Sequence, residues 1–173
     1  EMYNFLIQNK IYDPRIFNNL GSIYSQIKKF DQAILLFNES IKKFPDCLEA
    51  YSNLANVLVT KGSSDTAKNI LNKAIELNPK YLRSYSILAG ILVGEGDLEK
   101  AEFFLKKSLE INPKDINALV NLACVLKDSG NPMQAERFLK DALKINPSLE
   151  FALINLGAVL NELEKFDEGE QVL

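Results

Sequence analysis

Four asparagines recur at 34-residue intervals along this 173-residue chain, and their type and spacing suit them to binding. Asn19, Asn53, Asn121 and Asn155 share one place of that period, and Ile87 occupies the remaining place. An asparagine amide offers two donors and an acceptor, so it can pair with both the N–H and the C=O of an extended backbone. A row of such amides predicts recognition of a peptide with little demand on its side chains.

The residue types that usually carry catalysis are scarce or scattered. The sequence has no histidine, which removes the usual neutral-pH acid or base and the commonest metal ligand. Its carboxylates show no spacing typical of a catalytic pair, and no glycine-rich phosphate loop occurs. We therefore predict that the chain is not an enzyme and that it uses no metal or other cofactor.

The net charge, the hydrophobic runs and the cysteines indicate which kind of partner and which cellular environment to expect. The formal net charge is −3 and the sequence pI is about 5.2, whereas a nucleic-acid binder usually has a basic face. No run of 18 apolar residues is present, so no membrane span is predicted. Cys47 and Cys124 are too distant in the predicted array to bond, which indicates a reducing environment. We expect a protein or peptide partner, no nucleic acid, and an intracellular, cytoplasmic location.

The same 34-residue period runs through the residues that must position the asparagines. Self-similarity at a fixed period is typical of a stacked array, in which each unit buries its apolar face only against its neighbours. The periodic columns are Leu20, Leu54, Leu88, Leu122 and Leu156; Gly21, Ala55, Ala89, Ala123 and Gly157; Ala33, Ala67, Ala101 and Ala135; and Pro45, Pro79, Pro113 and Pro147.

Each period predicts a helical hairpin, as residues 48–81 illustrate. Apolar residues from Tyr51 to Leu58 fall on one face of a helix, and a second such stripe runs from Ala67 to Ile75. Gly62 separates the two stripes and accepts the left-handed conformation common at helix ends. Asn78-Pro79 ends the second helix, because proline lacks the amide proton and disfavours helical geometry just before it.

This pattern of residues resembles the tetratricopeptide repeat. The first unit carries it most fully, at Phe17, Leu20-Gly21, Tyr24, Ala33, Phe37 and Pro45. The resemblance implies an all-α, right-handed superhelical solenoid of antiparallel helix pairs, in which the first helix of each pair lines a concave groove. The predicted repeats are 14–47, 48–81, 82–115, 116–149 and 150–173, the last truncated in its second helix, with 1–13 as the second helix of a partial preceding repeat.

Two departures from the pattern carry expectations of their own. Lys28 and Glu164 replace the glycine between the two helices, so we expect the first helix to end differently there. Arrays of this kind need a polar cap at each end. Neither end shows one, which predicts a segment of something longer and leaves self-association through the uncapped ends open.

The asparagine row is similar to the asparagine ladder in the tetratricopeptide superhelix of O-linked N-acetylglucosamine transferase. A competing interpretation gives these amides a structural role, bonded to a neighbouring helix. The residues expected to point away from the packed seam and to bind peptide are Asn18, Asn19, Ser52, Asn53, Asn56, Arg83, Ser86, Asn117, Val120, Asn121, Phe151 and Asn155. For Phe151, packing against a downstream segment is the alternative.

The predicted function is a protein–protein interaction scaffold that binds an extended or helical segment of a partner in its concave groove. The alternative is a substrate-recruiting arm of a larger enzyme, such as a glycosyltransferase, whose catalytic domain lies outside this chain.

Overall fold

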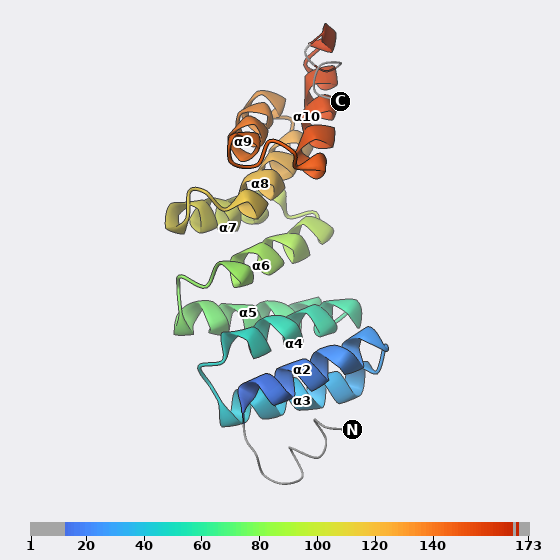
Figure 1. Ribbon diagram of the computed structural model, residues 1–173, viewed down its shortest axis with the longest axis vertical. Coiled ribbons are helices and arrows are strands. Elements are labelled where there is room, and N and C mark those ends of the chain that lie inside the picture. The colour runs from blue at the N-terminus through green and yellow to red at the C-terminus, as the bar shows by residue number, and fades with distance from the viewer. Residues whose placement is uncertain (1–12, 168, 170–173) are drawn as a thin grey trace. The chain divides into compact units, whose positions relative to one another are not determined.

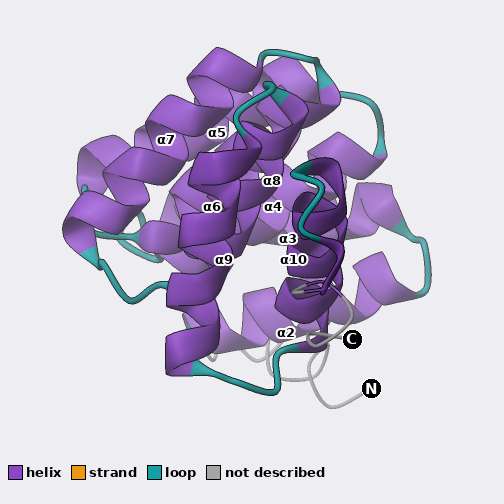
Figure 2. Cartoon of the chain, turned by 90° about the horizontal axis from the view of Figure 1, so that it is seen from above, coloured by secondary structure: helices purple, strands orange, loops and turns teal. Residues whose placement is uncertain are grey.

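The computed structural model describes residues 13–167 and 169, and their secondary structure is helical without strands (Figure 2). The predicted class, an all-α solenoid of antiparallel helix pairs, is confirmed for this part of the chain. The segment 1–12, expected to hold most of a preceding helix, lies outside it. The helices are α2 (Pro14–Gln26), α3 (Phe30–Lys43), α4 (Leu48–Thr60), α5 (Ser64–Leu77), α6 (Leu82–Gly94), α7 (Leu98–Ile111), α8 (Ile116–Asp128), α9 (Pro132–Ile145) and α10 (Glu150–Glu162).

The chain divides into two compact units, residues 1–87 and 88–173. In the first unit α2 packs on α3, α3 on α4 and α4 on α5, and α2 also lies against α4 (Figure 1). In the second unit α7 packs on α8, α8 on α9 and α9 on α10, and α8 also touches α10. Helices α2, α4, α6, α8 and α10 are called the first helices below. Within each unit, neighbouring first helices therefore present their outward faces side by side.

The periodic columns form the core. The five periodic leucines and the four alanines of the second helices are all buried, as their spacing predicts: Leu20, Leu54, Leu88, Leu122, Leu156, Ala33, Ala67, Ala101 and Ala135. Interiors are packed as densely as organic crystals, so small residues at these places fix how closely the helices approach. The stacking that positions the candidate site is therefore common to all the described repeats.

One contact in the first repeat differs from its counterparts. Phe37 is buried beneath Gly21, and a Cβ atom added at position 21 would lie 2.5 Å from its ring carbon Cε1. In the next three repeats the small residue is alanine, and the residue sixteen places later is leucine: Ala55 with Leu71, Ala89 with Leu105, and Ala123 with Leu139. Glycine thus accompanies the larger phenylalanine, and alanine accompanies the smaller leucine.

Side-chain caps and fixed backbone conformations set the helix ends. The carboxylate of Asp13 accepts from the Arg15 N–H, and that of Asp115 accepts from the N–H groups of Asn117 and Ala118. Such caps satisfy amides that have no partner inside the helix. Pro132 is the first residue of α9, where its missing N–H costs nothing.

The turns inside the hairpins share one left-handed residue. It is glycine in three repeats, Gly62, Gly96 and Gly130, with φ between 77° and 79°. Lys28 and Glu164 occupy the same place with φ of 59° and 57°. The expectation that the first helix ends differently at these two residues is therefore wrong. The chain keeps the same turn and places an ordinary side chain in a conformation that favours glycine.

Replacing Lys28 by glycine is expected to raise the free energy of unfolding by about 0.5–1 kcal/mol. The left-handed conformation costs a non-glycine residue about 1–2 kcal/mol, and the greater freedom of glycine in the unfolded chain offsets part of the gain. Urea denaturation followed by circular dichroism measures the change. Lys29→Gly is the matched control, because Lys29 has φ of −87° and glycine relieves no strain there. An equal gain from both changes would contradict the explanation.

Candidate functional site

The asparagine row lies on first helices in both units. Asn19 on α2 and Asn121 on α8 are exposed, whereas Asn53 on α4 and Asn155 on α10 are half-buried. The same place in each repeat thus presents its amide to a different degree, because the residues around it differ from repeat to repeat.

Three of the four asparagines already have partners within the chain, and the hydrogen bonds of Asn53 and Asn155 are the best defined; Asn19 also has an interaction of its own. Asn53 Oδ1 accepts from Arg83 Nη2 at 3.2 Å. Asn155 Nδ2 donates to the Phe151 carbonyl oxygen at 2.6 Å, and its Oδ1 accepts from the Cys124 thiol at 3.4 Å. Asn155 therefore links α10 to α8, as the structural interpretation of the row requires. Asn121 has no hydrogen-bond partner among the described residues and remains available to a ligand.

Three residues expected to point away from the seam are buried, so that prediction was wrong for Asn18, Ser52 and Val120. All three occupy the fifth place of their repeats, and two of them contact the segment that leads into the next first helix. Asn18 Nδ2 donates to Cys47 Sγ at 3.2 Å, and Ser52 Oγ donates to the Tyr81 hydroxyl oxygen at 3.4 Å, each 29 residues later. Asn18 and Ser52 therefore stabilise the connection to the next repeat, whereas Ile154 at the same place of its repeat is exposed.

The other predicted residues reach the surface to different extents. Asn56, Arg83, Asn117 and Phe151 are exposed, and Ser86 is half-buried, with its hydroxyl donating to the Leu82 carbonyl oxygen at 3.4 Å. Their role in binding a peptide stays a prediction.

The first unit contains a polar hollow between α2 and α4, floored by one residue of α3. Its volume is about 210 Å³. Amide and hydroxyl groups dominate its lining, so it offers hydrogen bonds in several directions. The residues that line this polar hollow are Ser22, Ser25, Gln26, Phe37, Asn53, Asn56 and Val57.

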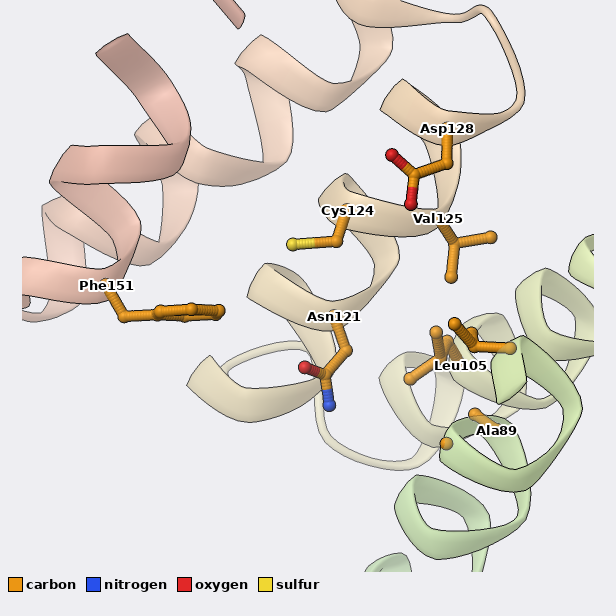
Figure 3. A pocket seen from close by; sticks show the side chains of 9 residues that line it. Ala89, Leu105, Asn121, Cys124, Val125, Asp128 and Phe151 are labelled. Carbon is orange, nitrogen blue, oxygen red and sulfur yellow. The ribbon is translucent and has the colours of Figure 1, made fainter. Parts of the chain in front are cut away.

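The second unit contains an apolar hollow at the equivalent place, with a volume of about 240 Å³. Figure 3 shows Phe151 on one side, Leu105 and Ala89 on the other, and Asn121 and Cys124 between them. Asp128 lies farther along α8. The residues that line this apolar hollow are Ala89, Gly90, Val93, Leu105, Asn121, Cys124, Val125, Asp128 and Phe151. The Phe151 side chain is exposed over more than half of its surface.

Sequence comparison decides the family. The family model described as tetratricopeptide repeat matches residues 27–91 and 92–150, which is more than half of the chain. The chain belongs to the tetratricopeptide repeat family. No curated protein sequence matches it.

Solved structures with the tetratricopeptide fold are similar to this chain. The pilF protein of Pseudomonas aeruginosa has a TM-score of 0.82 at 20% identity, covering 92% of this chain and 72% of its own. TTC0263 of Thermus thermophilus has a TM-score of 0.73 at 24% identity, covering 92% and 88%. YrrB, described as a TPR protein with an unusual peptide-binding site, has a TM-score of 0.70 at 19% identity, covering 99% and 89%. At these identities the likeness shows the fold alone.

The electrostatics of the apolar hollow of this tetratricopeptide chain are simple. Burial raises the pKa of the Cys124 thiol above its usual value, so the thiol is neutral at pH 7 and donates to Asn155. Asp128 is half exposed, and its carboxylate lies 3.2 Å from the ammonium of the adjacent Lys127. The hollow thus combines an apolar interior with one amide and one accessible carboxylate.

No described helix combines the length and the apolar character that crossing a membrane requires.

Leu105 lines the apolar hollow, but the sequence pattern did not predict it as a site residue. It belongs to a second helix and to a core column, so its spacing indicates packing alone. A signal nevertheless exists, because its column reads Phe37, Leu71, Leu105 and Leu139, and a leucine fills less space than a phenylalanine. A shorter side chain there leaves room above it when the neighbouring first helix carries glycine, as it does at Gly90.

Proposed function

We propose that this tetratricopeptide chain is a non-catalytic scaffold that binds an extended segment of a partner protein along the outward faces of its first helices. The family as such is a protein-interaction repeat, and the similar YrrB is described as having a peptide-binding site. The observation that carries the proposal is Asn121. Its exposed amide has no partner among the described residues and borders the apolar hollow, where a backbone with one anchored side chain can satisfy it.

The perturbed carboxyl groups support a non-catalytic role. The pKa of Asp13 is lowered by hydrogen bonds from Arg15, and the pKa of Glu136 is lowered by hydrogen bonds from Lys140 and Lys165. A general acid at neutral pH needs a raised carboxyl pKa instead. Both groups act as ordinary ion-pair partners.

A random twelve-residue peptide library displayed on phage, selected on the intact chain, tests the proposal. Enriched peptides are then synthesised, and their Kd is measured by isothermal titration calorimetry for the wild type, Asn121→Ala and Asn72→Ala. Loss of two neutral hydrogen bonds is expected to weaken binding about 5- to 10-fold for Asn121→Ala. Asn72 is an exposed asparagine on the second helix α5, so Asn72→Ala should bind as the wild type does.

Asn155→Ala separates binding from structure. Because its amide bonds to Phe151 and Cys124, its loss should lower the melting temperature, whereas Asn121→Ala should leave it unchanged. If no peptide is enriched, or if Asn121→Ala and Asn72→Ala bind selected peptides equally well, the proposal is wrong in this form.

A further inference from the structure

We propose that the apolar hollow accepts one large apolar side chain, phenylalanine or leucine, from a partner peptide that carries lysine or arginine two residues away. The basic residue pairs with Asp128. This inference rests on the proposed function and specifies the chemistry of its partner.

The size of the hollow sets the occupant at one side chain. An engineered cavity of about 150 Å³ binds benzene, whereas sites for drug-sized molecules enclose about 300–1,000 Å³. The apolar hollow, at about 240 Å³ and open to solvent at Phe151, lies between these limits. It therefore fits an aromatic ring or a branched aliphatic side chain with its backbone outside.

Comparison with the polar hollow shows that the apolar lining is particular to the second unit. The two hollows occupy the same places in their repeats, and corresponding residues lie two repeats apart in the sequence: Ser22 corresponds to Gly90, Ser25 to Val93, and Phe37 to Leu105. Two hydroxyls are thus replaced by a glycine and a valine, and the floor residue is shortened. A Cβ atom at Gly90 would have no neighbour within 4 Å, so the missing side chain leaves open space.

The polar groups at the hollow specify the rest of the peptide. Asn121, Cys124, Val125 and Asp128 follow one another along one face of α8 (Figure 3). The Cys124 thiol is already engaged with Asn155, which leaves the Asn121 amide for the peptide backbone and the Asp128 carboxylate for a cation. The ion pair of Asp128 with its neighbour Lys127 is exposed at the surface and so contributes little to stability. A cation of the ligand can therefore replace Lys127 beside the Asp128 carboxylate at little cost in free energy.

The spacing of the peptide follows from the geometry of the helix. One helical turn, about 5.4 Å, separates the Cys124–Val125 level of the hollow from Asp128. Side chains on the same side of an extended peptide recur every two residues, about 6.6 Å. An apolar anchor above Cys124 therefore brings a basic residue two places away to Asp128.

The test uses the intact chain and a seven-residue serine peptide with a central phenylalanine and a lysine two places to either side. Two companion peptides replace the phenylalanine by serine or both lysines by glutamine. Binding is followed by shifts of backbone amide signals in NMR titrations. The protein variants are Gly90→Leu, which fills the hollow, Asp128→Asn, and Gln134→Leu, which adds the same leucine to an exposed position of the second helix α9.

Saturable binding to the wild type and to Gln134→Leu is expected, with shifts at Asn121 and Val125. Removing the phenylalanine or introducing Gly90→Leu should weaken binding at least tenfold, since a buried aromatic ring contributes about 1.5–3 kcal/mol. Asp128→Asn should weaken the lysine peptide about 2- to 5-fold and leave the glutamine peptide unchanged. Thermal melting should show Gly90→Leu to be folded, because leucine is the better helix former.

Equal binding by the wild type and Gly90→Leu would overturn the inference, as would no saturable binding of the probe at all. Shifts confined to the polar hollow of the first unit would overturn it too, while leaving the proposed function standing. The proposed function fails only on the library selection and the Asn121→Ala binding comparison, neither of which uses this probe, so the two failures are distinguishable.

Discussion

Gly21→Ala is expected to lower the free energy of unfolding by about 1–3 kcal/mol, although alanine is the better helix former. The new methyl group would lie 2.5 Å from Cε1 and 2.8 Å from Cζ of Phe37. That ring is almost completely buried, so it has little room to move aside. Urea denaturation measures the loss. Gly90→Ala is the matched control, because a Cβ atom there meets nothing within 4 Å and should raise stability by about 0.5–1 kcal/mol.

A double substitution makes the explanation testable. Phe37→Leu alone removes buried volume and is expected to cost about 1 kcal/mol or more. Gly21→Ala combined with Phe37→Leu recreates the alanine–leucine pair of the next three repeats, so the two losses should largely cancel. We expect a coupling energy of about 1–3 kcal/mol. Additive losses would show that the two residues do not compete for the same space.

Glu136→Gln is expected to lower the free energy of unfolding by about 1–3 kcal/mol at pH 7. The Glu136 carboxylate is buried on α9, and it accepts from Lys140 Nζ at 2.6 Å and from Lys165 Nζ at 2.8 Å. Lys165 follows α10, so this carboxylate connects two elements. Glu110→Gln is the control, because Glu110 pairs with Lys107 at 2.8 Å on the exposed surface, where an ion pair contributes about 0–1 kcal/mol.

The contribution of Glu136 should depend on pH in one direction. The Lys140 hydrogen bond, then that of Lys165, holds the pKa of Glu136 below its ordinary value of 4.5. A carboxyl whose pKa is lower in the folded state stabilises the fold above its unfolded-state pKa, and that stabilisation is lost as pH falls through the folded-state value. The stability difference between wild type and Glu136→Gln should therefore shrink below about pH 4.5. A difference that stays constant from neutral to acid pH would contradict this account.

The periodic pattern predicted the packing well and the surface less well. Leucine and alanine columns indicate the buried faces correctly, because every repeat uses the same places for stacking. The burial of Asn18 and Ser52 was not predictable from helical spacing, since it depends on the path of the segment that leads into the next repeat. The left-handed turn at Lys28 was missed because side-chain preference alone argues against it. The packing of the two helices against each other outweighs the local preference of lysine for a right-handed or extended conformation.

The apolar hollow likewise could not be predicted from the sequence pattern, because its depth depends on a floor residue from one helix and a missing side chain on another. Leu105 and Gly90 each have an ordinary explanation when considered alone. Only their juxtaposition in the fold reveals the space between them. Asn155 shows the converse, because its place in the asparagine row suggests a ligand while its hydrogen bonds serve the chain itself.

The separation between packing places and lining places has a consequence for how such repeats diverge after duplication. Residues such as Ser22 and Gly90 line a hollow without filling the core, so single substitutions there can alter surface chemistry while the fold persists. Phe37 and Leu105 belong to both sets. A substitution of either floor residue must be matched by one at Gly21 or Ala89. If the floor residue is shortened first, no intermediate sequence places a methyl group against the larger phenylalanine ring. Duplicated repeats can thus accept single substitutions at the lining place of Ser22 and Gly90, but need paired substitutions at the floor place of Phe37 and Leu105.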